Sequence, residues 1–410
     1  MIKKMKRLVL TLGFCLVAVV CFGQKKAVSD ALKLAKDAKP NFVEARNLIK
    51  GALQHPETKD DAKTWYTAGQ IENSQFDKEN IKLLTGQTPN EDVMYNALLA
   101  IYPYFAKTYE LDNLPDAKGK VKPKYVKDMK AITKVNLPHY INGGAYFYEK
   151  SDFKKAFAFW DQYVTISDSK MMREGEPPTL AVDSNYIIAN YYCAMAALLI
   201  DPATAVPALK RASKQDFKQN DVYQYLAEAY LTLEDVDNYE KTLIEGFGLF
   251  PTETYFYMNL IKIYIDNDKN DKALEYTQIA INKDPENAQL FNVLGIVYES
   301  GFKDYAKAEE AFLKAIAADG ENADSQANLG RIYYNQGVAQ LDVANDITDV
   351  KKYNEEKEKA KVLFRKALPY YEKSFSLTQT IFDVKIALRN IYYQLDMGDK
   401  YEAIDKLLGE

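Results

Sequence analysis

Cysteine is scarce in this chain of 410 residues, which contains three. Cys15 and Cys21 lie in an apolar run near the N-terminus, so Cys193 is the only thiol beyond that run. An internal disulfide is therefore excluded from the rest of the chain. Cys193 stands in an apolar stretch with helical spacing, where we expect a packed thiol, with an intermolecular bridge as the alternative.

Residue types that carry catalysis and metal binding are equally rare. The two histidines, His55 and His139, do not stand at ligand spacing, and no zinc, nucleophile–base or glycine-rich phosphate motif can be assembled. The segment Asp266-x-Asp268-x-Asn270 resembles the start of a calcium loop, but it lacks the glycine at the sixth position and the glutamate at the twelfth. We therefore predict no catalytic residue, no metal site and no cofactor, and a protein that is not an enzyme.

Glycine and proline are also few. The chain has 18 glycines and 14 prolines, a joint share below the average of about 12%. Almost no segment alternates apolar and polar residues with period two, whereas apolar spacings of three and four recur throughout. The sequence predicts an all-α fold.

One long apolar run is present, over residues 8–22, and it follows a cationic start. A cationic start, about 15 apolar residues and small residues at the −3 and −1 positions are typical of a cleavable export signal, here residues 1–23. The run is shorter than the roughly 18–20 residues of a spanning helix, and Gly13 interrupts it. An uncleaved anchor is an alternative. A lipoprotein is another, although bulky residues precede both cysteines of the run.

Cleavage after residue 23 would leave 410 − 23 = 387 residues and remove four cations, so the net charge would move from −5 to −9. A surplus of negative charge argues against nucleic acid as a partner. We expect export to the periplasm, with association with the outer membrane left open, and no membrane-spanning segment in the mature chain.

A period of about 34 residues runs through the second half of the chain. Leucine followed four residues later by tyrosine recurs at offsets of 34, 34 and 35. A period of this size predicts one helical hairpin copied along the chain, with each copy burying its apolar face on the next. The leucine–tyrosine pairs are Leu226 and Tyr230, Leu260 and Tyr264, Leu294 and Tyr298, and Leu329 and Tyr333.

The pattern resembles the tetratricopeptide repeat family, in which aromatic, Leu-Gly, Tyr, Ala, aromatic, Ala and Pro recur at fixed offsets. Gly320 stands where the family favours proline. The resemblance is strong over residues 183–378 and looser before them. It implies an α-solenoid of about nine antiparallel hairpins, wound as a right-handed superhelix. The copy that matches best contains Phe291, Leu294, Gly295, Tyr298, Tyr305, Ala308, Phe312, Ala315 and Asp319.

The predicted organisation has four parts. The signal, 1–23, precedes divergent hairpins over 24–170, a linker over 171–184 and the regular array over 185–410. Within the array one hairpin, at about 323–378, is overlong, and the last helix is a polar cap. Inside the second hairpin, the polar residues from Phe76 to Asp92 predict a loop.

The resemblance also implies which side chains face the concave groove of such an array. The first helix of each hairpin supplies them, and Asp221, Asp324 and Ala327 occupy positions of this kind. A lysine four residues before an asparagine, which grips a C-terminal carboxylate in the co-chaperone subgroup, is absent. The candidate partner-binding residues are Gln224, Glu228, Tyr255, Met258, Lys262, Gln289, Asn292, Ile296, Arg331 and Tyr334.

We expect a non-enzymatic scaffold or adaptor that holds protein or peptide partners in cell-envelope assembly. The alternative is a carbohydrate-binding helical-repeat protein, although Trp65 and Trp160 both stand at packing positions. The seven lysines over residues 118–134 form the strongest basic cluster. They fit either a solvated linker and helix start or a contact with an acidic partner or lipid headgroups.

Overall fold

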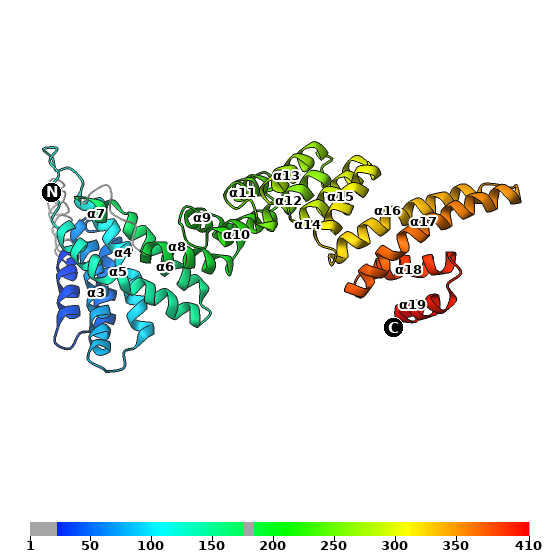
Figure 1. The fold of residues 1–410 in the computed structure, drawn as a ribbon. Coiled ribbons are helices and arrows are strands. Elements are labelled where there is room, and N and C mark those ends of the chain that lie inside the picture. Colours follow the sequence, from blue (N-terminus) through cyan, green and yellow to red (C-terminus); the bar gives the residue numbers. More distant parts are fainter. Residues whose placement is uncertain (1–22, 176–183, 410) are drawn as a thin grey trace, which may run out of the picture. The chain divides into compact units, whose positions relative to one another are not determined.

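The computed structural model describes residues 23–175 and 184–409, with the side chain of Phe382 excepted, and forms two compact units, Met1–Glu234 and Asp235–Glu410. Nearly all of the predicted signal, 1–23, lies outside these residues, as does most of the predicted linker, 171–184. The division at 171–184 stays a prediction. Every regular element within the described residues is a helix (Figure 1), so the predicted all-α class is confirmed.

In the N-terminal unit, residues 23–36 form the first helix of four antiparallel hairpins, which are followed by a single helix, α10. The hairpins pair 23–36 with α2, α3 with α4, α5 with α6, and α8 with α9. The helices are α2 (Phe42–Gln54), α3 (Ala62–Leu84), α4 (Glu91–Asp112), α5 (Val126–Glu149), α6 (Phe153–Asp168), α7 (Lys170–Arg173), α8 (Ser184–Leu198), α9 (Pro202–Ala212) and α10 (Gln219–Thr232).

In the C-terminal unit, α11 is followed by four hairpins. They pair α12 with α13, α14 and η1 with α15, α16 with α17, and α18 with α19. This is the helical-repeat array that the 34-residue period predicted. The helices are α11 (Val236–Leu249), α12 (Thr254–Asp266), α13 (Asn270–Lys283), α14 (Ala288–Ile296), the π-helix η1 (Val297–Phe302), α15 (Tyr305–Ala318), α16 (Ala323–Asn345), α17 (Val350–Leu377), α18 (Phe382–Gln394) and α19 (Gly398–Gly409).

Small residues set the distance between the two helices of a hairpin. The Gly295 position on α14 faces the ring of Phe312 on α15, and a Cβ built there would lie 2.4 Å from Cε1 of that ring. Phe312 is fully buried, beside Ala308 and Ala315. The helices therefore approach closely because glycine and alanine leave room for one large ring, and the core consists of such layers.

In α12, α16 and α18 the repeated tyrosine of the first helix joins neighbouring hairpins. Its hydroxyl donates a hydrogen bond to a glutamate on the second helix of the preceding hairpin or on α11, and a lysine of its own second helix lies over the ring at 5.2 to 5.7 Å. In these three helices the contacts favour tyrosine over phenylalanine, whereas the hydroxyl of Tyr230 on α10 is buried without a hydrogen-bond partner among the described residues. The pairs are Tyr264 with Glu240 at 2.9 Å, Tyr333 with Glu309 at 2.6 Å and Tyr392 with Glu372 at 3.1 Å.

The turns between paired helices have a common geometry. Ser151, Asp268, Lys303 and Asp396 each adopt a left-handed backbone, with φ between 55° and 60°. At the end of α12, the amide of Lys269 donates to the carbonyl of Tyr264 at 2.7 Å, as in a Schellman cap. One residue with positive φ therefore lets the chain reverse into the second helix.

The predicted loop from Phe76 to Asp92 is wrong over most of its length. α3 continues to Leu84, only Thr85–Asn90 connects it to α4, and Phe76 is buried, with 1% of its surface exposed. The polar residues that suggested a loop belong to this helix, and one of them, Glu79, is buried and pairs with Lys82. The apolar anchors that reveal such a helix are sparse here, so the periodicity signal is weak.

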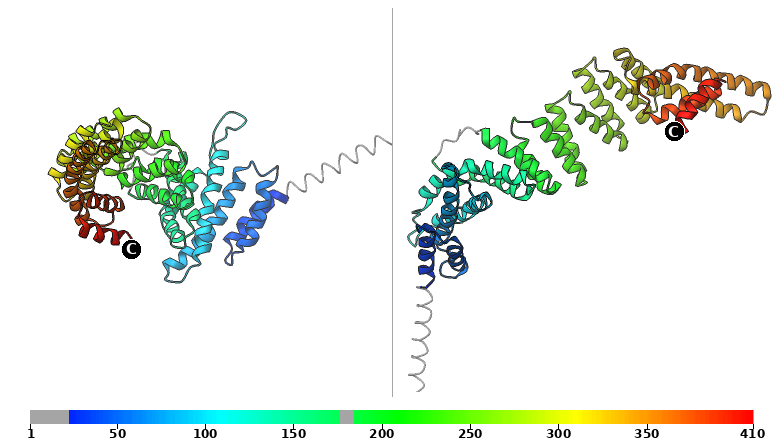
Figure 2. Two further views of the ribbon diagram at one scale, coloured as in Figure 1. Left: turned by 90° about the vertical axis from the view of Figure 1, so that its right-hand side faces the viewer. Right: turned by 90° about the horizontal axis from the view of Figure 1, so that it is seen from below.

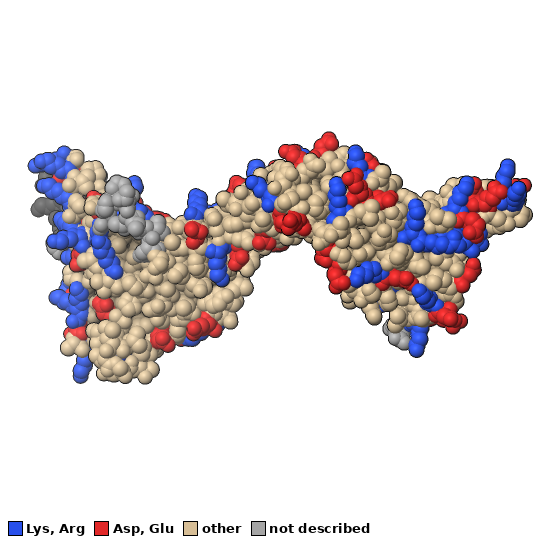
Figure 3. Space-filling view, in the orientation of Figure 1, with Lys and Arg blue, Asp and Glu red and all other residues tan. Residues whose placement is uncertain are grey.

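The connection between α4 and α5, residues 113–125, is the longest described loop of the N-terminal unit. It projects beyond the ends of the neighbouring helices (Figure 2). Lysine and arginine side chains cover this end of the unit in the space-filling view of Figure 3. The lysine-bearing linker expected before α5 is therefore an exposed, ordered connection.

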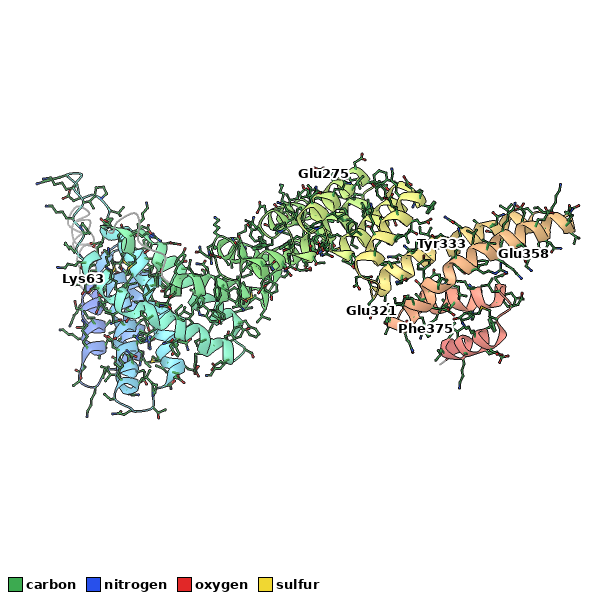
Figure 4. The ribbon with its side chains drawn as sticks, viewed as in Figure 1. Lys63, Glu275, Glu321, Tyr333, Glu358 and Phe375 are labelled. Carbon is green, nitrogen blue, oxygen red and sulfur yellow. The ribbon has the colours of Figure 1, made fainter. Side chains whose placement is uncertain are left out.

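α16 and α17 form the overlong hairpin. They contain 23 and 28 residues, compared with 14 in α15, and their far ends extend past the helices packed at their base. Glu321 and Phe375 mark the base and Glu358 lies along the projecting part (Figure 4). Phe364 and Tyr371 fill the space opposite Gly337 and Gly330, so the close packing continues along the hairpin.

Candidate functional site

Four of the sequence-predicted residues gather around one cavity in the C-terminal unit. Gln289, Asn292 and Ile296 come from α14, and Arg331 comes from α16. The cavity has a volume of about 270 Å³. Helices α16, α17 and α18, with the residue that precedes α18, supply the other walls. The residues of these walls are Asp324, Ala327 and Asn328 of α16, Tyr371 of α17, Ile381 before α18, and Asp383 and Val384 of α18.

Local sequence explains why these side chains share a face. The side chain of Asn287 caps α14 by accepting from the amide of Gln289 at 3.0 Å, which starts the helix at this point. Residues 289, 292 and 296 then follow at intervals of three and four, as one face of a helix requires. On α16, residues 324, 327, 328 and 331 follow the same rule.

Two asparagines join the helices at the cavity wall. Nδ2 of Asn328 on α16 donates to Oδ1 of Asn292 on α14 at 2.9 Å. Asn292 is buried, with 2% of its surface exposed. The amide nitrogen of Asn292 and the amide oxygen of Asn328 form no hydrogen bond with any described residue. One donor and one acceptor are therefore left over, which is the pair that a peptide group can satisfy.

The charges around the cavity are unequal. Arg331 makes a two-point contact with Glu299, Nε to Oε1 at 3.1 Å and Nη2 to Oε2 at 2.5 Å, so its charge is compensated. Asp324 and Asp383 are exposed and form no ion pair with a described residue. The open side of the cavity is therefore acidic, while burial raises the pKa of the Tyr371 hydroxyl and keeps it neutral.

Comparison with known families decides what kind of array this is. The tetratricopeptide repeat model matches residues 258–323 and 300–340, which include most of the cavity wall. This stretch of the chain is therefore built from tetratricopeptide repeats. No curated protein matches it.

Solved structures of tetratricopeptide-repeat proteins resemble parts of the chain. A repeat protein from Bacteroides fragilis is 19% identical with a TM-score of 0.33, and the match covers 63% of this chain and 98% of that one. A thermophilic repeat protein from Thermus thermophilus is 18% identical with a TM-score of 0.32, and the match covers 47% of this chain and 90% of that one. MamA from Desulfovibrio magneticus is 18% identical with a TM-score of 0.31, and the match covers 45% of this chain and 98% of that one. Likenesses of this size say nothing about the ligand of this chain.

The other predicted groove residues of the tetratricopeptide repeats lie outside the cavity. Tyr334 accepts a hydrogen bond from Asn390 of α18 at 2.9 Å and packs on Phe364 and Tyr371, so it helps to hold α18. On α12, Lys262 is exposed and pairs with Asp266 at 3.5 Å, while Tyr255 and Met258 are half-buried. Gln224 and Glu228 lie on α10, in the N-terminal unit. Their role in partner binding stays a prediction.

Sequence reasoning missed the contribution of α18 to the cavity. The 34-residue period breaks at the overlong hairpin, so the next first helix could not be aligned by counting. A signal was nevertheless present, because Leu388 and Tyr392 repeat the spacing of Leu329 and Tyr333 exactly 59 residues later. The same offset places Asp383 at the position of Asp324, which is where the structure has it on the cavity rim.

Groups that support other chemistry do not come together in the described parts of the chain. Within residues 23–175 and 184–409, no three His, Cys, Asp or Glu side chains are placed to hold a metal ion. Nor does any described helix have both the length and the apolar character needed to cross a membrane. Cys193 is fully buried, and burial raises the pKa of its thiol to about 12, which suits a packed, unreactive thiol.

Neither tryptophan offers the open ring face that sugar stacking requires. Trp160 is 97% buried by the packing of α5, α6 and α8, where its ring meets Tyr148 and Tyr192. Trp65 packs on Tyr104, and its indole N–H donates to the carbonyl of Lys59 at 2.6 Å. Both rings therefore serve the fold, as the repeat positions of these residues predicted.

Proposed function

We propose that this tetratricopeptide-repeat protein is a non-catalytic scaffold that binds a segment of a partner protein in the cavity between α14, α16 and α18. The repeat fold itself is an interaction scaffold, and the cavity adds a definite place of contact. The bound segment is extended and carries an aliphatic side chain next to a lysine or arginine.

The size of the cavity favours a side chain over a free small molecule. Small-molecule sites usually measure about 300–1,000 Å³ and enclose most of their ligand. A cavity of about 270 Å³ with an open side suits one or two residues of a chain that continues past it. Ile296, Ala327, Ile381 and Val384 supply the apolar wall for the aliphatic residue.

The single observation that carries the proposal is the asparagine pair. Asn292 lines the cavity, and its amide nitrogen has no hydrogen-bond partner among the described residues. The pair leaves one donor and one acceptor unused beside an apolar wall. An extended backbone supplies both partners at once, and the unpaired carboxylates of Asp324 and Asp383 add attraction for a cationic neighbour.

The setting that we propose is the cell envelope. Support comes from the cationic start and apolar run of residues 1–23, which are typical of an export signal. The mature protein would then begin at Gln24. Mass spectrometry of the protein from the periplasmic fraction tests this, because a chain that retains Met1, or one found only in the cytoplasm, contradicts it.

Site-specific photo-crosslinking in living cells tests the scaffold function. A benzophenone amino acid at Ile381, on the cavity wall, is compared with one at Val362, an exposed residue of α17 away from the cavity. We expect position 381 to capture a discrete partner protein and position 362 to capture little of it. Equal capture at both positions, or capture of the chain itself alone, contradicts the proposal.

A charge-matched pair of variants makes this test sharper. Replacing Asp324 and Asp383 with asparagine removes two charges at the rim and should reduce capture at position 381 several-fold. The control is the same change at Asp342 and Asp346, exposed residues at the far end of α16. If the rim variant and the control capture the partner equally well, the cavity is not the contact site.

A further inference from the structure

The loop between α4 and α5 carries a row of lysines that the fold does not use. Lys118, Lys120, Lys122, Lys124 and Lys127 are all exposed. None of the five forms an ion pair with a described residue. Five free ammonium groups within ten residues are unusual in a chain whose net charge is −5, so repulsion among them works against the folded loop.

Backbone hydrogen bonds to two aspartates hold the loop in shape in spite of this repulsion. Oδ1 of Asp116 accepts from the amides of Lys118 and Lys120, both at 2.9 Å. Oδ2 of Asp112 accepts from the amides of Lys124 and Tyr125, both at 2.7 Å. The acidic side chains therefore bind the main chain, and the lysine side chains stay on the outside of an ordered loop.

One of the lysines, Lys127, lies where a positive charge does not assist helix formation, although Asp128 follows it in the same turn. Lys127 lies in the first turn of α5, where the helix dipole favours negative charge. The cap residue, Tyr125, makes no side-chain capping bond. Because stability does not explain these cations, a ligand outside the chain is the better explanation.

Two aliphatic side chains accompany the charges. Val121 lies between Lys120 and Lys122 and is 50% exposed, and Leu114 at the start of the loop is 59% exposed. Exposed aliphatic groups flanked by cations occur where a segment rests on a membrane, with the apolar group in the interface and the ammonium groups at the phosphates.

We infer that this projecting loop, residues 113–127, binds the surface of an anionic lipid membrane. Protein interfaces are depleted in lysine and enriched in arginine and aromatic residues. The loop has five lysines and no arginine, so a diffuse layer of phosphates suits it better than an acidic protein does. The loop projects from the unit (Figures 2 and 3), so a flat surface can approach it. This inference is independent of the peptide cavity in the C-terminal unit.

Vesicle sedimentation with the full chain tests the inference. Binding to vesicles of phosphatidylcholine alone reports any contribution of the apolar run at the N-terminus, and binding to vesicles with added phosphatidylglycerol reports the extra attraction of charge. We expect a preference for the anionic vesicles that falls as salt is raised, because screening weakens attraction to the surface.

Two variants of equal charge identify the residues responsible. Replacing the five loop lysines with glutamine should reduce the preference for anionic vesicles by roughly 100-fold, since each lysine near such a surface contributes about fivefold and not all five reach it together. The control replaces five exposed lysines elsewhere, Lys214, Lys241, Lys283, Lys351 and Lys352, and should keep most of the preference. Val121→Ser should weaken binding by a few-fold without changing its salt dependence.

Either of two other outcomes would overturn the inference that the loop binds an anionic membrane. Equal loss in the two lysine variants would show that net charge, rather than the loop, attracts the vesicles. No preference for anionic vesicles, combined with loop-dependent binding to poly-glutamate, would show that the loop meets an acidic protein. Circular dichroism of both variants, which we expect to match that of the wild type, checks that they are folded.

Discussion

At the scale of single residues, the array depends on small side chains facing large rings. Gly295 faces Phe312, Gly246 faces Phe256, and a Cβ at either glycine would lie within 2.5 Å of the ring. Alanine is the better helix former by about 1 kcal/mol, so propensity alone would favour replacing these glycines. Packing must therefore account for their presence.

Gly295→Ala should lower the free energy of unfolding. The added methyl must displace the buried Phe312 ring, and overpacking of this kind costs about 1–3 kcal/mol, of which helix propensity returns about 1. We expect a net loss of up to about 2 kcal/mol in the free energy of unfolding by urea. Gly248→Ala on α11 is the control, because nothing lies within 4 Å of its Cβ. A Gly295→Ala protein as stable as this control would show that the ring is free to move.

Tyr333→Phe tests the hydrogen bond that joins α16 to α15. Burial, and then the bond to Glu309, raise the pKa of the Tyr333 hydroxyl above its ordinary value. The unfolded tyrosine releases its proton near pH 10, whereas the folded one keeps it, so this contribution to stability is complete below pH 10 and is lost as pH rises further. At pH 7 we expect the free energy of unfolding of the variant to be about 1 kcal/mol lower than that of the wild type.

Urea midpoints measured at pH 7, 9, 10 and 11 supply the check on Tyr333→Phe. The wild-type midpoint should fall more steeply than that of the variant above pH 10, so the two curves approach each other. Parallel curves would mean that the folded and unfolded tyrosine share one pKa.

At the scale of the hairpin, one left-handed residue sets each reversal of direction. Asp268 has φ of 55° between α12 and α13 and makes no side-chain bond within the described residues. Glycine adopts this backbone without the Cβ penalty. Asp268→Gly should therefore raise the free energy of unfolding by up to about 1 kcal/mol.

Asp271→Gly, one turn later, should instead lower the free energy of unfolding. Asp271 lies in the first turn of α13, where glycine costs about 0.5–1 kcal/mol of helix stability and the acidic group is lost from the helix N-terminus. Thermal unfolding of the two variants beside the wild type compares them. If Asp268→Gly is the less stable of the pair, the left-handed turn is not a strained position.

The sequence predicts hairpins best where leucine, tyrosine and alanine recur at fixed offsets. Leu260, Tyr264 and Ala273 are fully buried at the positions that the period assigned. In α3 the prediction of a loop after Phe76 was wrong, because residues 77–84 contain few apolar anchors and their helix is held by packing on α4. Local periodicity cannot report a contact with a distant helix.

The cavity could be predicted only in part for a related reason. Gln289, Asn292, Ile296 and Arg331 follow from the period of the first helices. Asp383 and Val384 do not, because the extra length of α16 and α17 moves α18 out of register. The pairing of Asn292 with Asn328 needs coordinates, since the two side chains lie 36 residues apart.

At the scale of the whole molecule, each hairpin contacts its neighbours along the chain and little else. Stability in such an array is a sum of local terms. We therefore expect the effect of Gly295→Ala on hydrogen exchange to be greatest in α12–α17 and absent from α3–α6 of the N-terminal unit. Uniform loss of protection over both units would instead mean that the chain unfolds as a single cooperative body.

The claim that this array is a peptide-binding scaffold is tested most directly by filling the cavity. Peptides selected on the purified full chain are titrated by calorimetry against Ala327→Phe, which puts a ring into the cavity, and Ala403→Phe, which puts one on the exposed face of α19. We predict peptides with an aliphatic residue beside a lysine or arginine, at least tenfold weaker binding to Ala327→Phe and unchanged binding to Ala403→Phe. Selected peptides that bind both variants as tightly as the wild type would contradict this claim.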